Sequence, residues 1–307
     1  MRIITDTVHD HDYPPLAATV GCFDGMHRGH AFLISQVCAE AEARQLKSAL
    51  ITFPVHPRQV IQPDRKPELL TCLPQKIELM QKCGADFSIL LPFTHELSLF
   101  SALDFMRLLR DKFSVKSLVI GYDHRFGHNR LEDISDYRRY GEMLGIRVVQ
   151  ARALIDDGVS VSSSLIRKLL KSGAVSEANR YLGYNYCFDG IVEDGYKVGR
   201  TLGFPTANIR TSCSEKLIPA VGVYAAYVHL EGSLYPSVVN IGFRPTFTDC
   251  RQLSIEVNLL HFSGDIYRRQ LKVELVSYIR PEHKFQSAEQ LVLQIRKDSI
   301  TAENILK

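Results

Sequence analysis

A glycine-rich stretch at residues 21–30 carries the residue types best suited to chemistry in this sequence. It reads Gly-Cys-Phe-Asp-Gly-Met-His-Arg-Gly-His and follows an apolar run at 16–20 that predicts a buried strand. An apolar segment that begins at residue 31 predicts a helix directly afterwards. The first backbone N–H groups of a helix lack partners, and its dipole favours negative charge. The stretch therefore predicts a phosphate-binding loop.

His27 and His30 are spaced to share one face at the helix start, where their ring N–H groups could donate to phosphate oxygens. The three glycines of the stretch permit a sharp turn and a close ligand. Two other interpretations are a capped turn with solvated histidines and a His-x-x-His metal pair. The metal pair lacks further ligands at plausible spacing nearby, so the phosphate site is favoured.

The stretch resembles the H-x-G-H signature of nucleotidyltransferases with a Rossmann-like fold. The longer form, G-x-F-D-G-x-H-x-G-H, is similar to the version carried by bacterial FAD synthetases. The resemblance implies that ATP binds here and that two of the residues, His27 and His30, are catalytic. The ATP-binding residues that it implies are Gly21, Phe23, Asp24, Gly25, His27, Gly29 and His30.

Two motifs follow other predicted strands and suit a flavin. The first, Thr-Phe-Pro-Val-His-Pro-Arg at 52–58, could be only a proline-stiffened loop, but it is similar to the family's T-F-x-P-H-P, with Val55 in place of the first proline. The second, at 121–130, combines a carboxylate, an aromatic ring and arginines, or forms a polar turn. It resembles G-x-D-F-x-F-G, with His124 replacing the first phenylalanine. The flavin-binding residues implied are Phe53, His56, Pro57, Asp123 and Phe126.

A serine run at 161–167 caps a predicted helix and is followed by an arginine. It could be an ordinary surface helix or a second helix N-terminus that faces a triphosphate. It resembles the nucleotidyltransferase signature I-S-S-T-x-I-R, which adds Ser163, Ser164 and Arg167 to the implied ATP site.

Apolar runs and helical patterns alternate through the first half of the chain, with strands expected at 16–20, 49–53, 87–91, 117–120 and 147–149. This alternation predicts a parallel sheet covered by helices, which binds ligands at the carboxyl ends of its strands. Short alternating runs after residue 183 predict a small antiparallel β-barrel, and a helix is expected at 287–306 with Leu291, Val292 and Ile295 inward. We expect an α/β Rossmann-like nucleotidyltransferase domain at 1–183 and the barrel domain with its C-terminal helix at 184–307.

The barrel half contains a glycine-rich loop at 195–208 that ends in Thr206 and Asn208. Their oxygens are hard donors that suit Mg²⁺, although a simple hairpin loop fits the residues about as well. The loop is not a Walker A sequence, but it closely resembles the riboflavin kinase motif G-R-x-L-G-F-P-T-A-N. Matches to N-I-G-x-R-P-T-F at 240–247 and to G-V-Y at 222–224 add to the resemblance. It implies Mg²⁺ at Thr206 and Asn208, and an ATP site that comprises Gly195, Lys197, Gly199, Gly203, Thr206 and Asn208.

Glu256 lies in the middle of a predicted strand, where a glutamate usually faces only solvent. In the kinase family, the matching glutamate of E-x-H is the general base, which makes Glu256 a catalytic candidate. Asn258 stands where the family's histidine would be.

Composition limits the remaining possibilities. The 307 residues are 45% hydrophobic and 23% charged, with a net charge of +3, which argues against nucleic acid as a partner. The seven cysteines lack paired spacing, and there is neither an apolar run of spanning length nor a signal-peptide core, so a cytoplasmic protein without a membrane partner is expected. The oligomeric state is left open.

The resemblance covers nearly the whole chain and implies a bifunctional riboflavin kinase and FMN adenylyltransferase, with ATP, riboflavin, FMN and FAD as substrates and products. One alternative is a single-activity nucleotidyltransferase whose barrel only binds flavin or regulates. Another is a nucleic-acid binder that uses the barrel as an oligonucleotide-binding fold, although the barrel lacks a dense basic stripe.

Overall fold

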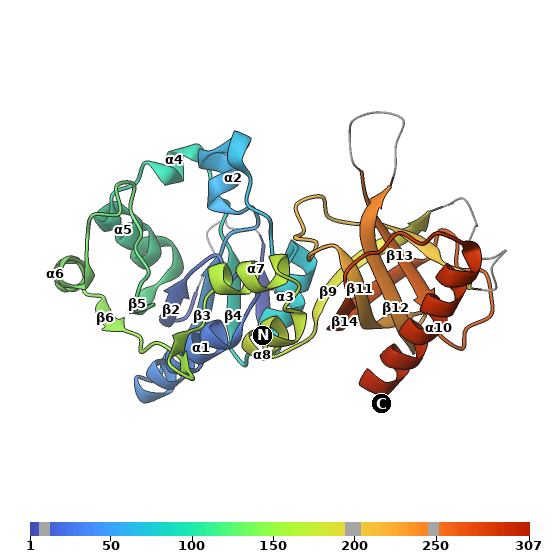
Figure 1. The fold of residues 1–307 in the computed structure, drawn as a ribbon. Coiled ribbons are helices and arrows are strands. Elements are labelled where there is room, and N and C mark those ends of the chain that lie inside the picture. Colours follow the sequence, from blue (N-terminus) through green and yellow to red (C-terminus); the bar gives the residue numbers. More distant parts are fainter. Residues whose placement is uncertain (6–12, 194–203, 245–251) are drawn as a thin grey trace. The chain divides into compact units, whose positions relative to one another are not determined.

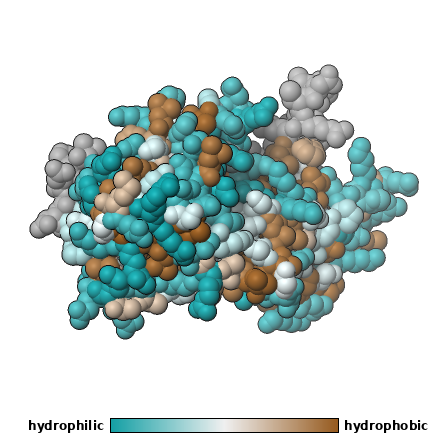
Figure 2. Space-filling model, turned by 90° about the vertical axis from the view of Figure 1, so that its left-hand side faces the viewer, coloured by the Kyte–Doolittle hydropathy of each residue, from teal (hydrophilic) through white to brown (hydrophobic). Residues whose placement is uncertain are grey.

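The computed structural model describes residues 1–5, 13–193, 204–244 and 252–307 (Figure 1). The chain divides into two compact units, residues 1–163 and 164–307. Within the described ranges, no helix is both long enough and apolar enough to cross a membrane. Figure 2 shows one face of the molecule, over which apolar residues are interspersed with polar ones.

The first unit is built on a six-stranded parallel sheet, as predicted, in the order β1-β4-β3-β2-β5-β6. The edge strand β1 was not predicted, because three residues are too few to show a pattern. The strands are β1 (Arg2–Ile4), β2 (Leu16–Val20), β3 (Lys47–Thr52), β4 (Phe87–Leu90), β5 (Val115–Ile120) and β6 (Arg147–Gln150).

Helices connect these strands, and capping side chains fix where several of them begin. The helix expected from residue 31 starts three residues earlier, because His27 caps it. An unpredicted hairpin, β7 (Ile155–Asp156) and β8 (Val159–Ser160), follows the sheet. The helices are α1 (Arg28–Ala43), α2 (Pro57–Ile61), η1 (Pro63–Arg65), α3 (Leu73–Gln81), α4 (His95–Ser98), α5 (Ala102–Phe113) and α6 (Ile134–Leu144).

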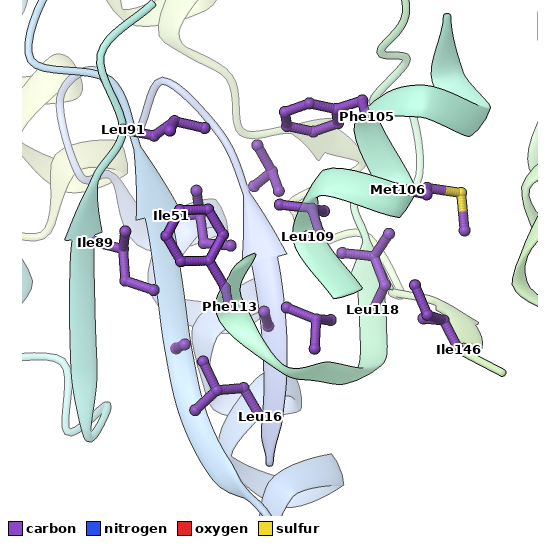
Figure 3. Close-up of a cluster of buried hydrophobic side chains, with 14 of the residues drawn as sticks. Leu16, Ile51, Ile89, Leu91, Phe105, Met106, Leu109, Phe113, Leu118 and Ile146 are labelled. Atoms are coloured by element: carbon purple, nitrogen blue, oxygen red, sulfur yellow. The ribbon is translucent and has the colours of Figure 1, made fainter. Parts of the chain in front are cut away.

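Alternate residues of the central strands supply two cores, one on each face of the sheet. Ile51 of β3 packs with Phe105 and Phe113 of α5 (Figure 3), whereas its neighbour Leu50 packs with Ile34 of α1 on the other face. Successive side chains of a strand point to opposite faces, so a strand buried on both faces must be apolar throughout. This burial holds the carboxyl ends of the strands, and the loops that follow them, in fixed positions.

The second unit contains a closed antiparallel barrel, in the order β10-β13-β12-β11-β14-β9, as predicted. The strand β10 was missed, because its sequence Ala-Asn-Ile-Arg-Thr alternates too briefly. The elements are α7 (Ser163–Lys171), α8 (Val175–Leu182), β9 (Tyr186–Glu193), β10 (Ala207–Thr211), β11 (Gly222–Leu230), β12 (Ser233–Arg244), β13 (Gln252–Leu259), β14 (Gln270–Arg280) and α10 (Ala288–Ile305).

The C-terminal helix α10 packs on the barrel, but not only through the apolar residues that were predicted. Leu291, Val292 and Ile295 are half-buried, while Asp298 is 3% exposed. Asp298 accepts two short hydrogen bonds from Arg280 at the end of β14, from Nε at 2.9 Å and Nη2 at 2.6 Å. Burial of a carboxylate requires such a partner, so this ion pair helps to fix α10 against β14.

Candidate active sites

The predicted phosphate loop lies at the carboxyl end of β2 and leads directly into α1. His27 is the N-cap of the helix, and its Nδ1 accepts a hydrogen bond of 3.3 Å from the backbone N–H of His30. The two imidazole rings stack with centroids 3.7 Å apart. The structure therefore brings the predicted histidine pair together at the helix N-terminus.

His30 is the more available donor of the pair. Its Nδ1 is buried and has no hydrogen-bond partner among the described residues. Burial lowers the pKa of His30 well below its usual value, and the nearby His27, His124 and Lys76 lower the pKa further. His30 is therefore a neutral imidazole at neutral pH. It can donate an N–H to a phosphate oxygen, and no buried charge has to be maintained before the phosphate binds.

Two of the loop glycines are required by geometry. Gly25 has a φ of +84°, a conformation that side chains disfavour. A Cβ on Gly29 would lie 3.0 Å from the carbonyl oxygen of Val161 and 3.1 Å from the ring of His27. The absence of a side chain at Gly29 thus lets the backbone of Val161 and the ring of His27 pack against the start of the helix.

Asp24 and Phe23 shape the loop from within the fold. The Asp24 carboxylate accepts backbone hydrogen bonds from Leu70 and Thr71, each at 2.9 Å, and is 5% exposed. Phe23 is buried and lies edge-on to His30 at 5.3 Å. Contacts of these two residues with ATP stay a prediction, since the structure shows them bracing the turn.

We expect Asp24→Asn to lower the free energy of unfolding of the first unit by about 1–2 kcal/mol, because charge-assisted hydrogen bonds to Leu70 and Thr71 become weaker neutral ones. A urea titration followed by circular dichroism measures this change. Asp64→Asn, at an exposed position, is the matched control and should leave stability unchanged. Unchanged stability in Asp24→Asn with a raised KM for ATP would instead place the carboxylate at the nucleotide.

Lys76 is a buried residue of the site that the sequence analysis missed. Its ammonium group donates to the carbonyl oxygens of Phe53 at 2.7 Å and Cys22 at 3.3 Å, and to the Thr52 hydroxyl at 3.3 Å. Burial lowers its pKa. Lys76 thereby joins the ends of β2 and β3, which carry the phosphate loop and the first flavin motif. No sequence signal could have revealed it, because it is an isolated lysine in a helix.

The serine run begins α7 as expected. The Ser163 hydroxyl, at the end of the first unit, donates to the backbone carbonyl of Asp24 in the glycine loop at 2.8 Å. Ser164 is exposed and Arg167 is half-buried further along the helix, in the second unit. Only Ser163 of the three predicted residues is therefore shown beside the loop.

An apolar pocket opens at the carboxyl edge of the sheet, next to the phosphate loop. Of the five predicted flavin residues, Phe53, Pro57 and Phe126 line it, while Asp123 is exposed and does not. His56 instead caps α2 by accepting from the Arg58 N–H at 3.1 Å, and it lines a smaller neighbouring pocket. The pocket also includes Arg125, His128 and Arg130 of the predicted 121–130 motif, together with three aromatic residues that were missed, Phe93, Phe100 and Phe105.

One of these aromatic residues, Phe93, could have been predicted from its place in the sequence. Phe93 follows β4, and ligands of parallel sheets bind outside the carboxyl ends of strands. Phe105 was expected only as an apolar residue of its helix. Val55, where the family motif has proline, is exposed and not among the lining residues, so this departure lies away from the pocket.

The second candidate site lies on the outer face of the barrel, between its strands and α10. Ile255 and Val257 are buried toward the barrel interior, so Glu256 between them faces outward. Strand pairing places Asn208 of β10 and Asn240 of β12 directly opposite Glu256, one on each side. The register thus aligns one carboxylate and two amides across three strands.

Glu256 and Asn240 border a cavity of about 300 Å³, whereas Asn208, one of the two predicted Mg²⁺ ligands, is not among its lining residues. Thr206, Glu256 and Asn240 supply polar groups, and Phe204 and Phe285 supply aromatic ones. The predicted residues Gly195, Lys197, Gly199 and Gly203 lie outside the residues that the structure describes. Asn240 belongs to a quoted motif, but its place beside Glu256 could be seen only from the strand register.

Asn258, the departure from the kinase motif, has a clear structural role. Its Nδ2 donates to the carbonyl oxygen of Pro205 at 2.8 Å. This hydrogen bond joins β13 to the loop immediately before Thr206. The amide therefore supports the segment that carries the predicted Mg²⁺ ligand Thr206.

Each unit combines polar groups suited to phosphate chemistry with an adjoining cavity that has aromatic walls. This combination defines a nucleotide-dependent transferase that acts on an aromatic substrate. Comparisons with known proteins make the assignment specific. A family described as FAD synthetase matches residues 9–165, and one described as riboflavin kinase matches residues 182–306.

Relatives match nearly the whole chain. The bifunctional riboflavin kinase/FMN adenylyltransferase of Listeria monocytogenes is 36% identical over 91% of this chain and 88% of its own. That of Escherichia coli strain K12 is 35% identical over 92% and 90%, respectively. The chain therefore belongs to the bifunctional riboflavin kinase/FMN adenylyltransferase family.

A solved structure shares the fold along the whole chain. It is described as a macrolide-efflux protein from Streptococcus pneumoniae, and it is 28% identical, with a TM-score of 0.89 over 98% of this chain and 99% of that chain. Its description names a different activity, so this likeness bears on the fold.

Proposed function

We propose that this chain converts riboflavin to FMN in its second unit and FMN to FAD in its first, with ATP as the donor in both steps. The observation that supports the proposal is the presence of two distinct candidate sites in one chain. An imidazole pair at a helix N-terminus adjoins an aromatic pocket in the first unit. A carboxylate flanked by amides borders a cavity in the second.

In the kinase step, Glu256 would accept the proton of the terminal ribityl hydroxyl of riboflavin as that oxygen attacks the γ-phosphorus of ATP, the bond between the γ-phosphorus and the bridging oxygen breaks, and ADP leaves. Thr206 and Asn208 supply the hydroxyl and amide oxygens that suit Mg²⁺, an ion that keeps water and phosphate oxygens as further ligands. No group of three or more His, Cys, Asp or Glu side chains able to hold a metal is present in the part of the chain that the structure describes. Bound Mg²⁺ would neutralise phosphate charge.

In the adenylyl step, an oxygen of the FMN phosphate attacks the α-phosphorus of ATP, a new P–O–P bond forms and pyrophosphate leaves. No protein nucleophile takes part. His27 and His30 would donate N–H groups to the phosphate oxygens on which negative charge grows, and Ser163, Ser164 and Arg167 would bind the triphosphate. The aromatic pocket with Phe53 and Phe126 would hold the isoalloxazine ring.

The domain boundary and the compartment are also proposals. Contacts divide the chain after residue 163, whereas the matched families end at 165 and begin at 182. We place the adenylyltransferase domain at 1–183 and the kinase domain at 184–307, because α7 would carry residues that serve the first reaction. A cytoplasmic location fits an enzyme that uses ATP in both steps.

The function is tested by incubating the purified protein with riboflavin, ATP and Mg²⁺ and separating riboflavin, FMN and FAD by chromatography. We expect FMN to form first and FAD to follow. A second incubation that begins with FMN isolates the adenylyl step. FAD from FMN without any FMN from riboflavin would reduce the protein to a single-activity nucleotidyltransferase whose barrel binds flavin or regulates.

A further inference from the structure

His124 presents an imidazole to the aromatic pocket of the first unit. It lines the pocket beside Phe126, with ring centroids 6.1 Å apart. Neither of its ring nitrogens has a hydrogen-bond partner among the described residues. His124 is half-buried, and a ring nitrogen that borders a cavity without a protein partner is suited to a ligand that enters the cavity.

The position of His124 also links the pocket to the phosphate loop. Its imidazole lies near enough to His30 to help lower the pKa of that residue. Burial and, to a smaller extent, the nearby Arg130 lower the pKa of His124 to about 4, although Asp123 opposes the shift. His124 is therefore neutral at physiological pH and has one N–H to donate between the aromatic walls and the catalytic histidines.

The ligand group expected between a flavin ring and the ATP phosphates is the phosphate of FMN. We propose that His124 donates a hydrogen bond to this phosphate and thereby makes the first unit select phosphorylated flavin over riboflavin. The inference rests on the proposed function of this unit. The family motif G-x-D-F-x-F-G has a phenylalanine at this position. A phenylalanine could pack against the flavin but could not donate a hydrogen bond to its phosphate.

The test compares His124→Phe, which keeps an aromatic ring, with His124→Gln, which keeps an N–H donor. FAD formation is measured with varied FMN and saturating ATP. Loss of a hydrogen bond to a charged group predicts a rise of about 10-fold or more in the KM for FMN in His124→Phe, and a KM within roughly 3-fold of the wild type in His124→Gln. A purely structural role would not be rescued by glutamine.

A phosphate-free competitor locates the contact. 5′-Deoxyriboflavin has the flavin ring but neither a phosphate nor the terminal hydroxyl, so the kinase site cannot phosphorylate it there. Its inhibition constant for FAD formation should be the same in wild type and His124→Phe, because only the phosphate contact is lost. A parallel rise in this constant would place His124 at the ring and overturn the proposal, as would an unchanged KM for FMN.

Two controls separate the possible failures. His95→Phe makes the same chemical change at an exposed position outside the pocket and should leave the KM for FMN unchanged. FMN formation from riboflavin should be equal in all variants, since His124 lies outside the kinase cavity. If the wild-type protein made no FAD from FMN, the function proposed for the first unit would fail; if it did so with the same KM as His124→Phe, only the role of His124 would fail.

Discussion

Replacing His30 by alanine is expected to lower the rate of FAD formation from FMN by about 10²–10³-fold, the usual cost of one lost donor to a developing charge. The buried Nδ1 of His30 has no partner among the described residues, and the neutral ring is already desolvated, so its N–H is prepared for a phosphate oxygen. Replacing His27 as well should lower the rate further. Initial rates with saturating FMN and ATP measure the effect.

The barrel provides an internal control for this variant. FMN formation from riboflavin should continue at the wild-type rate in His30→Ala, which would show that the second unit is folded, and an unchanged circular dichroism spectrum would show the same for the first unit. His95→Ala, at an exposed histidine, should leave both activities unchanged. Undiminished FAD synthesis in His30→Ala would remove the phosphate-binding interpretation of the glycine loop.

The second large effect is expected from Glu256→Gln, which should slow FMN formation by about 10²–10⁴-fold, the contribution of a general base. Glutamine keeps the size of the side chain and its place between Asn208 and Asn240 but cannot accept the proton. The variant should retain conversion of FMN to FAD. Single-turnover measurement of riboflavin phosphorylation tests this directly, because it separates the transfer step from product release.

Glu274→Gln is the matched control, since Glu274 also lies within a barrel strand but is absent from the cavity lining. It should phosphorylate riboflavin at the wild-type rate. If Glu256→Gln phosphorylated riboflavin at the wild-type rate, another group would have to accept the proton, and the carboxylate of Glu256 would be assigned to binding.

The fold was largely predictable from hydrophobic periodicity, because both architectures place strongly patterned strands in buried positions. The parallel sheet and the barrel were expected, and both are confirmed. The edge strand β1 and the strand β10 were missed because strands of three to five residues leave almost no periodic signal.

The candidate sites were only partly predictable. Motif residues with local roles, such as His27 as a helix cap, lie where the sequence placed them. Roles that depend on long-range contacts could not be predicted. Lys76 joins two strand ends from a helix, and Asp24 has its hydrogen bonds with a loop 46 residues away. Such roles depend on tertiary packing, which the spacing of residues along one segment does not encode.

The pairing of Glu256 with Asn208 and Asn240 has a consequence for how relatives can vary. A single-residue insertion or deletion inside β13 would turn the carboxylate into the apolar barrel interior and expose Ile255 or Val257 in its place. Changes in chain length should therefore accumulate in the loops that join the barrel strands, while the lengths of β10, β12 and β13 around this row stay fixed.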